Sequence, residues 1–114
     1  MNISEKTKTK LRNLDVGAVY LFGSRATGTA FPNSDYDIGV VFLDYSKEID
    51  MEIISSIYST LNEEFPDHIN GPKLDISYLQ NANAALQMKA VSEGIVSFES
   101  NPTFRADYEA EVVK

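Results

Sequence analysis

The chain has 114 residues, a length typical of one domain, and it contains no cysteine, which excludes disulfides, thiolate metal sites and cysteine nucleophiles. Its formal net charge of −7 disfavours DNA or RNA as the main partner, because an acidic surface repels a phosphate backbone unless basic residues gather locally. Residues 1–10 are polar and no apolar run reaches the roughly 20 residues that span a bilayer, so we expect a soluble, cytoplasmic domain of residues 1–114 without a signal peptide or membrane contact.

The first predicted element is a helix over residues 3–15, with Ser4 as its N-cap and a sparse apolar face. It carries the main basic cluster of the sequence, which consists of Lys6, Lys8, Lys10 and Arg12. A spacing of two residues scatters these side chains around a helix instead of lining one face. We therefore interpret them as a solvated surface, with a nucleic-acid site as the less favoured alternative.

Two strands and a loop follow. Residues 18–22 form a short apolar run that ends at Gly23 and predicts a buried strand. Residues 23–34 are rich in Gly, Ser, Thr, Asn and Pro, which indicates a loop with room for one helical turn. Residues 36–43 are predicted to form the second strand.

The second half of the chain continues the alternation. Ser46 is predicted to begin a helix that ends at Pro66, with an apolar stripe at Ile49, Ile53, Ile57, Leu61 and Phe65 that Ile54 and Tyr58 widen. After a turn at residues 70–72, residues 73–79 alternate apolar and polar as a third strand. The last predicted elements are a helix over 82–93 that stops at Gly94 as its C′ residue, a short strand over 95–98, and a helix after Pro102 with Phe104, Tyr108 and Val112 on one face. This order predicts an α/β (α+β) fold, a small mixed sheet with helices packed on it.

A Gly-Ser pair stands where the first strand ends. Gly23 has no side chain and lets the backbone approach a ligand closely. The Ser24 hydroxyl and the N–H groups of a following helical turn can donate to phosphate oxygens. Alone, the pair is more often an ordinary turn.

Two aspartates open the second predicted strand. Asp35 and Asp37 flank Tyr36, and a spacing of two in a strand places both carboxylates on one face. Adjacent carboxylates raise each other's pKa unless a cation neutralises them, and hard oxygen ligands of this kind suit Mg²⁺. Taken alone, the pair is better explained as a solvated strand end that Ser34 and Asp35 cap.

Asp75 is the third acid of interest, inside the third predicted strand between Leu74 and Ile76. In a sheet it can face the same side as Asp35 and Asp37. There it can complete a metal site or accept a proton, although an exposed edge-strand position is the better explanation when Asp75 is taken on its own.

A strand that ends in Gly-Ser, then ten residues, then Asp-x-Asp at the start of the next strand and an Asp inside a third strand form a pattern that is more restrictive than its parts. This pattern resembles the DNA polymerase beta nucleotidyltransferase superfamily, most closely the minimal nucleotidyltransferases (MNT). The residues that match are Gly23, Ser24, Gly28, Ser34, Asp35, Asp37 and Asp75. Residues 88–99, MKAVSEGIVSFE, also resemble the helix, Glu-Gly and strand that end the family domain. The resemblance covers nearly the whole chain and implies the polymerase beta-like fold.

The resemblance also implies an activity. Members of the family transfer a nucleoside monophosphate from a nucleoside triphosphate to an acceptor hydroxyl and release pyrophosphate. Carried over, Gly23 and Ser24 would bind the triphosphate, Asp35 and Asp37 would hold one or two Mg²⁺ ions, and Asp75 would be the third catalytic carboxylate and metal ligand. If a group must take the acceptor's proton, Asp75 is the candidate.

The remaining candidates are less sharply defined. Ser34 is grouped with the nucleotide-binding residues, whereas Arg25 can either reach a phosphate bidentately or point to solvent, two alternatives that we weight equally. Gly39 departs from the commoner leucine-rich strand after the aspartate pair and can allow a close backbone approach. His68, the only histidine, is interpreted as a surface residue.

The resemblance finally suggests the acceptor. Minimal nucleotidyltransferases often pair with small helical HEPN proteins as toxin–antitoxin modules, in which the nucleotidyltransferase adds AMP to a tyrosine of the toxin. By analogy, we expect ATP as the donor and a HEPN-type partner as the acceptor. The alternatives are an adenylyltransferase acting on a small hydroxyl compound and an antitoxin that docks without turnover. We also expect Phe104, Tyr108 and Val112 to dock a partner or a second copy of the chain, which would give a homo-oligomer.

Overall fold

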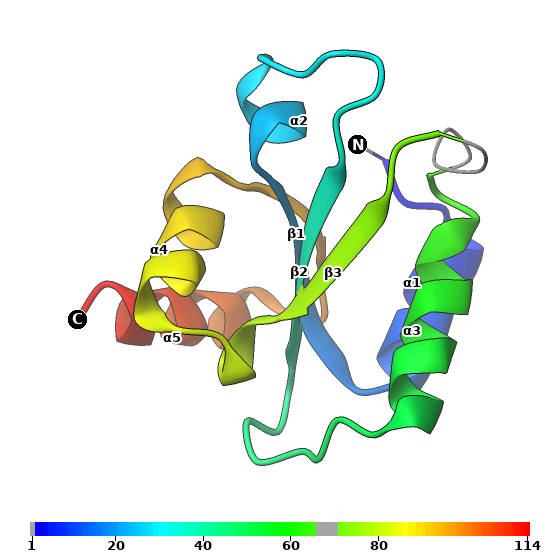
Figure 1. The fold of residues 1–114 in the computed structure, drawn as a ribbon. Helices are drawn as coiled ribbons and strands as arrows, with labels where there is room; N and C mark the ends of the chain where they lie inside the picture. Colours follow the sequence, from blue (N-terminus) through cyan, green and yellow to red (C-terminus); the bar gives the residue numbers. More distant parts are fainter. Residues whose placement is uncertain (1, 66–70) are drawn as a thin grey trace.

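A computed structural model of the protein describes residues 2–65 and 71–114. Its centre is a four-stranded sheet in the order β3-β2-β1-β4 (Figure 1). The strands are β1 Val16–Phe22, β2 Tyr36–Phe42, β3 Leu74–Tyr78 and β4 Ile95–Glu99. Strand β1 runs antiparallel to both β2 and β4, whereas β2 and β3 are parallel. The sheet is therefore mixed, as the sequence predicts.

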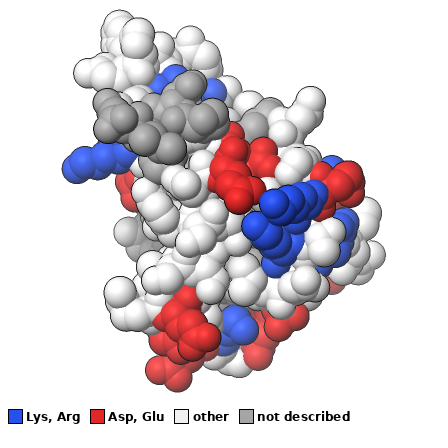
Figure 2. All heavy atoms as spheres, turned by 90° about the vertical axis from the view of Figure 1, so that its right-hand side faces the viewer, with Lys and Arg blue, Asp and Glu red and all other residues white. Residues whose placement is uncertain are grey.

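The helices cover both faces of this sheet. Helices α1 Glu5–Asn13 and α3 Met51–Asn62 lie on one side, and α4 Ala84–Glu93 and α5 Pro102–Val112 lie on the other (Figure 1). The surface on the α1/α3 side carries both basic and acidic side chains (Figure 2). The short helix α2 Ser24–Thr27 follows β1 at one end of the sheet, and the 3-10 helix η2 Leu79–Asn81 follows β3 at the other. Among the helices of the described residues, none combines the length and apolar character needed to cross a bilayer.

Alternation along the strands separates two apolar cores. Val19 and Leu21 of β1 face the α1/α3 side, and Ala18, Tyr20 and Phe22 face the α4/α5 side. On β2, Ile38, Val40 and Phe42 join the first core, while Val41 joins the second. Because side chains alternate along a strand, Asp37 and Gly39 belong to the α4/α5 face. This alternation determines on which face of the sheet the polar side chains of β2 lie.

Helix α3 begins later than the predicted start at Ser46. Its N-cap is Asp50, whose side chain accepts a hydrogen bond from the Ile53 N–H, and the helix ends at Asn62. Ser46 instead lies in a turn, where its N–H and hydroxyl both donate to Asp44 Oδ1 at 2.9 and 2.7 Å. Ile54 and Tyr58, predicted to widen the buried stripe, remain 36% and 43% exposed. His68 and Pro66 fall outside the described residues.

Gly94 also differs from its predicted role. It is the C-cap of α4, but its φ of −76° is not the left-handed conformation of a C′ glycine. A Cβ atom at this position would lie 2.1 Å from the Ala90 carbonyl oxygen and 3.3 Å from that of Leu21. The glycine is needed here because two backbone segments approach closely.

Helix α5 turns its apolar residues inward. Tyr108 is buried, and Phe104 and Val112 pack against the same core. A Cβ atom on Gly17 would lie 2.1 Å from Cε1 of the Phe104 ring, so this ring rests directly on the backbone of β1. These three side chains therefore pack mainly against the protein's own sheet, and docking of a partner or a second copy through them stays a prediction.

Candidate functional site

Two of the three predicted acids meet on the sheet. Asp37 of β2 is the register partner of Phe22 on β1 and of Asp75 on β3, so these three residues lie at one level of three adjacent strands. Neighbouring strands are about 4.8 Å apart, and paired residues point to the same face. Asp37 and Asp75 therefore stand side by side on the α4/α5 face, Asp37 half-buried and Asp75 exposed.

Asp35 lies just before β2 and is exposed. Its Oδ1 accepts a hydrogen bond from the Lys73 N–H at 3.2 Å, which ties the start of β2 to the residue that precedes β3. The Tyr36 N–H donates to the Lys73 carbonyl oxygen at 2.9 Å and reinforces the same junction. Asp35 thus helps to hold the strand ends that carry Asp37 and Asp75.

Gly23 is in contact with this group of acids. Its φ of +71° and ψ of −156° form a backbone conformation that is essentially restricted to glycine. A Cβ atom at this position would lie 2.2 Å from Asp37 Oδ2. The absent side chain of Gly23 therefore leaves the space that the Asp37 carboxylate occupies.

Ser24 opens helix α2 directly after this glycine. The Gly23 carbonyl oxygen accepts hydrogen bonds from the N–H groups of Ala26 and Thr27 at 3.0 and 3.1 Å. The N–H groups of Ser24 and Arg25 come first in the helix and have no acceptor within it. The predicted sequence of strand, Gly-Ser turn and helical turn is thus present, with its first N–H groups beside the acids.

The electrostatics of Asp37 reflect this crowding. Partial burial raises the pKa of its carboxyl group, and the charges of Asp75 and Asp35 raise it further. The positive charge of Lys89 acts in the opposite direction and favours the ionised form. Asp37 is therefore the carboxylate for which an added cation would be most favourable.

Lys89 is a residue of this site that the sequence does not reveal. It lies on α4, and its charge reaches Asp37 because α4 packs against β1 on the same face of the sheet. It falls within the stretch 88–99 that resembles the end of the family domain, but that resemblance gives the lysine no role, and a lysine on a predicted helix is ordinarily a solvated residue. Only the docking of α4 brings this charge to the acids.

Arg25 adopts an arrangement that neither predicted alternative includes. Its Nε and Nη2 donate to the Ser34 carbonyl oxygen at 3.2 and 2.8 Å, and Nη2 also donates to the Pro32 carbonyl oxygen at 3.2 Å. The guanidinium carbon lies 4.3 Å from the centroid of the Tyr36 ring. Arg25 therefore braces the loop between α2 and β2.

Ser34 belongs to the same loop structure. Its Oγ accepts a hydrogen bond from the Phe31 N–H at 2.8 Å, and its own N–H donates to the Phe31 carbonyl oxygen at 3.0 Å. Both contacts close a tight turn before Asp35. Nucleotide binding by Arg25 and Ser34 stays a prediction, and their observed contacts hold the loop that leads into the acids.

The arrangement of the acids suits a metal ion that takes some of its ligands from a bound substrate. It does not suit a metal ion that is held by protein side chains alone. Among the described residues, no three His, Cys, Asp or Glu side chains cluster closely enough to hold a metal ion alone. Mg²⁺ in proteins uses one or two carboxylates and completes its shell with water and substrate phosphates. The contact between the side-chain-free Gly23 and the Asp37 carboxylate places the predicted phosphate-binding turn next to a predicted metal ligand, so the donor set suits Mg²⁺.

Comparison with known proteins agrees with this geometry. The family model described as "Polymerase beta, Nucleotidyltransferase" matches residues 5–103. No curated protein matches the chain.

Solved structures supply the fold comparison. A toxin–antitoxin complex with AMP-PNP contains a chain with a TM-score of 0.68 and 21% identity, and the match covers 97% of this chain and 85% of that chain. A mutant MntA–HpeT toxin–antitoxin pair matches with a TM-score of 0.66 and 18% identity over 95% and 81% of the two chains. A tri-AMPylated Shewanella oneidensis HEPN toxin in complex with MNT antitoxin matches with a TM-score of 0.60 and 16% identity over 97% and 84%. At these identities the likeness is one of fold.

Proposed function

The chain belongs to the polymerase beta nucleotidyltransferase family, and from that premise we propose that it transfers AMP from ATP to a hydroxyl group of a partner protein. The observation that carries the proposal is the shared level of Asp37 and Asp75 beside the Gly23 turn. A phosphate chain and a pair of acids must come this close for one cation to serve both. The family match and this contact support the same chemistry independently.

Each residue of the site has a distinct role in the proposed reaction. Gly23 and Ser24 bind the triphosphate through the turn and the first N–H groups of α2, and Asp35, Asp37 and Asp75 hold Mg²⁺. When bound, the ion neutralises charge on the triphosphate and makes its α-phosphorus a better electrophile. The acceptor oxygen attacks that phosphorus, the bond to the β-phosphate oxygen breaks, and pyrophosphate leaves. Asp75, the more exposed acid of the pair, accepts the proton of the acceptor hydroxyl.

Lys89 adds a further element to this proposal. Its positive charge favours the ionised form of Asp37 in the protein. Once a cation and a triphosphate are bound, the same charge can stabilise the pyrophosphate as negative charge develops on it. We assign Lys89 to positioning and charge balance rather than to proton transfer.

The proposed acceptor is a HEPN-type toxin, and the protein would act as its antitoxin. Similar folds occur in toxin–antitoxin complexes, one with AMP-PNP and one with a tri-AMPylated HEPN toxin. The net charge of −7 suits a partner with a basic RNA-binding face. A cytoplasmic location is part of this proposal, because ATP and an intracellular ribonuclease meet there.

The test is the intact mass of the partner. The protein is co-purified with the product of the neighbouring gene, and the mass of that product is measured before and after addition of ATP and Mg²⁺. An added adenylate that is absent with Asp37→Asn and after chelation of the metal is the expected result. Asp44→Asn, which removes an exposed acid at the other end of β2, is the matched control and should transfer normally.

Other results would count against parts of the proposal. A stable complex without a mass change would favour an antitoxin that acts by docking alone. If no complex forms, small hydroxyl compounds become the acceptors to test. Full activity of Asp37→Asn would refute the assignment of the acids.

A further inference from the structure

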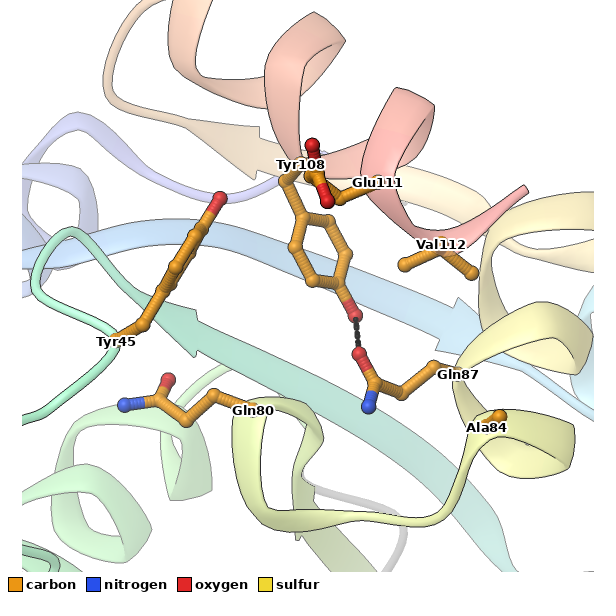
Figure 3. A pocket seen from close by; sticks show the side chains of 7 residues that line it. All are labelled: Tyr45, Gln80, Ala84, Gln87, Tyr108, Glu111 and Val112. Carbon is orange, nitrogen blue, oxygen red and sulfur yellow. Dashed lines mark hydrogen bonds between the residues drawn. The ribbon is translucent and has the colours of Figure 1, made fainter. Parts of the chain in front are cut away.

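A hollow that the proposed chemistry does not use lies at the other end of the sheet. A cavity of about 290 Å³ opens between the loop after β2, η2, and helices α4 and α5 (Figure 3). Its walls include Tyr45, Gln80, Gln87, Tyr108, Glu111 and Val112. Strand β2 leads from Asp37 to Leu43 over six residues, which is about 20 Å at 3.3 Å per residue. The cavity is therefore separate from the acids.

The polar side chains inside the cavity already have partners within the protein. The Tyr108 hydroxyl donates to Gln87 Oε1 at 2.9 Å, and Gln87 Nε2 donates to the Ala82 carbonyl oxygen at 2.9 Å. Gln80 Oε1 accepts the Phe42 N–H at 2.8 Å. These bonds fix the walls and leave the aromatic faces as the main surface offered to a ligand.

Tyr45 forms the outer wall of this cavity. Its ring centroid lies 6.2 Å from that of Tyr108 and 5.9 Å from that of Phe104, so its orientation is held by two other rings. Even so, the side chain is 48% exposed. Figure 3 shows Tyr45 and Tyr108 extending into the same space from different elements, with Gln80 and Gln87 approaching from other sides. A ring that is fixed yet exposed is suited to stack on a ligand.

The charged side chains that line the cavity beside Tyr45 are carboxylates, and one of them, Glu111, has an exposed ion-pair partner in Lys114, whose Nζ lies 3.6 Å from Glu111 Oε1. A second hollow, of about 510 Å³, shares Tyr45 and Glu111 with the first and adds Leu43, Phe104, Asp107 and Ala110. Neither hollow has a lysine or arginine in its lining. The pKa of the Tyr45 hydroxyl is raised, mainly by burial and further by the charges of Asp107 and Glu111. Aromatic faces beside carboxylates attract a cation and repel an anionic ligand such as a nucleotide.

We propose that these two joined hollows, the Tyr45 groove, bind an arginine side chain from an extended basic segment of a partner protein. A guanidinium plane can stack on a tyrosine ring while it pairs with Asp107, or with Glu111 in exchange for the exposed Lys114. The second hollow extends the surface past Leu43, which is 42% exposed, and gives the neighbouring residues of the segment an apolar wall. A second copy of this chain is a poor occupant, because each copy carries a net charge of −7.

This interaction does not depend on nucleotidyl transfer. It uses neither the acids at the start of β2 and β3 nor the Gly23 turn. If the partner is also the acceptor of the proposed reaction, the Tyr45 groove holds it from the end of the sheet opposite the acids. If it is not, the groove still binds its basic segment.

The test uses NMR titration of the ¹⁵N-labelled full chain with a short synthetic peptide of alternating arginine and serine. Saturable shifts are expected for the amides of Tyr45, Gln80 and Glu111, and not for those of Asp37 and Asp75. The same peptide with citrulline in place of arginine, which is neutral but nearly identical in shape, should not bind.

Variants test the residues of the groove. Tyr45→Ala and Glu111→Gln should each weaken peptide binding about two- to fivefold, the range of an exposed cation–π or ion-pair contact. Tyr45→Phe keeps the ring and should retain the affinity. Glu52→Gln makes the same charge change on α3, where the side chain is exposed, and is the matched control.

Several results would overturn the proposal. Equal binding of the citrulline peptide would remove the role of the charge, and equal losses for Glu52→Gln and Glu111→Gln would reduce it to general attraction. Full competition by spermine would assign the groove to a small cation instead. If Tyr45→Ala unfolds, Glu111→Gln decides the question. Asp37→Asn should bind the peptide normally, so failure of the groove and failure of the proposed transfer are distinguishable.

Discussion

Replacing Gly23 by alanine tests the contact on which the site depends. The backbone at φ +71° and ψ −156° costs a residue with a side chain about 1–3 kcal/mol. The new Cβ atom would also lie 2.2 Å from Asp37 Oδ2, closer than the 3.0 Å that real contacts respect. Turning the carboxylate out of its rotamer to relieve this costs roughly 1 kcal/mol more. We expect Gly23→Ala to lower the free energy of unfolding by about 2–4 kcal/mol, a large share of the stability of such a domain.

Urea unfolding followed by circular dichroism measures this loss. With a slope of about 1.5 kcal/mol per molar urea, 3 kcal/mol corresponds to a midpoint shift of about 2 M. Gly28→Ala is the matched control, because Gly28 also has a positive φ, +80°, but a Cβ atom there would meet nothing within 4 Å. That variant should lose only the cost of the left-handed backbone, about 1–2 kcal/mol.

The comparison can refute the reasoning. If Gly23→Ala costs no more than Gly28→Ala, the close approach of Asp37 is wrong. A double-mutant cycle isolates the contact, since in an Asp37→Ala background the cost of Gly23→Ala should fall toward that of Gly28→Ala. Additive losses would show that Asp37 does not meet residue 23.

Four further predictions concern charge, loop and cap. A raised pKa means that ionised Asp37 opposes folding, so Asp37→Asn should raise the free energy of unfolding at pH 7 by less than about 1 kcal/mol after solvent screening, and the gain should vanish below pH of about 4. Lys89→Met removes the charge that favours ionised Asp37, so NMR titration of the carboxyl group should show its pKa raised further. Arg25→Lys should speed amide exchange in the loop between α2 and β2, because an ammonium cannot reproduce the bonds of the guanidinium fork. Asp50→Ala should cost about 1 kcal/mol as a lost N-cap, and Ser46→Ala less than about 0.5 kcal/mol.

Each of these predictions has a result that contradicts it. A stability gain for Asp37→Asn that persists in acid would not come from its ionisation, and an unchanged pKa in Lys89→Met would place that lysine away from the acids. Normal loop exchange in Arg25→Lys would mean that the brace is not needed. Equal losses for Asp50→Ala and Ser46→Ala would contradict the assignment of Asp50 as the N-cap of α3.

Strands and the facing of their residues were predictable from the sequence, because both follow from local alternation. Apolar runs predict β1 and β2, and Asp37 lies near the start of β2 as expected, whereas Asp35 lies just before the strand. The side of Asp75 follows from the same rule once β3 pairs with β2 in parallel register. The family likewise could be recognised, because Gly23, Ser24 and the acids stand at restrictive spacings, and the family match confirms it.

Features that depend on competition between local contacts were not predictable. Ser46 and Asp50 are both good N-cap residues, and the choice between them follows from Asp44, whose carboxylate holds Ser46 in a turn. Gly94 has the residue type of a C′ glycine, but the close approach of the Ala90 carbonyl oxygen, with that of Leu21 nearby, explains it. Sequence patterns describe one element at a time, and these outcomes involve two.

Features that depend on how helices dock were also hidden. Lys89 reaches Asp37 only through the placement of α4 on the sheet. The apolar spacing of α5 predicts a buried face but cannot say whether a partner or the protein's own sheet buries it, and Phe104 on Gly17 answers that question. The Tyr45 groove arises from the same docking.

Because β3 lies at the edge of the sheet, Asp75 can separate from Asp37 without unfolding of the whole protein. Asp37 lies on a strand with neighbours on both sides, whereas Asp75 lies on a five-residue strand that is hydrogen-bonded to β2 alone. Edge segments detach at a lower free energy than the whole molecule unfolds. A brief opening of β3 would therefore part the two acids while the rest of the sheet stays intact. The fraction of molecules with an assembled site is then governed by this local equilibrium. A substitution in β3 can therefore abolish the activity of the site without lowering the melting temperature of the protein.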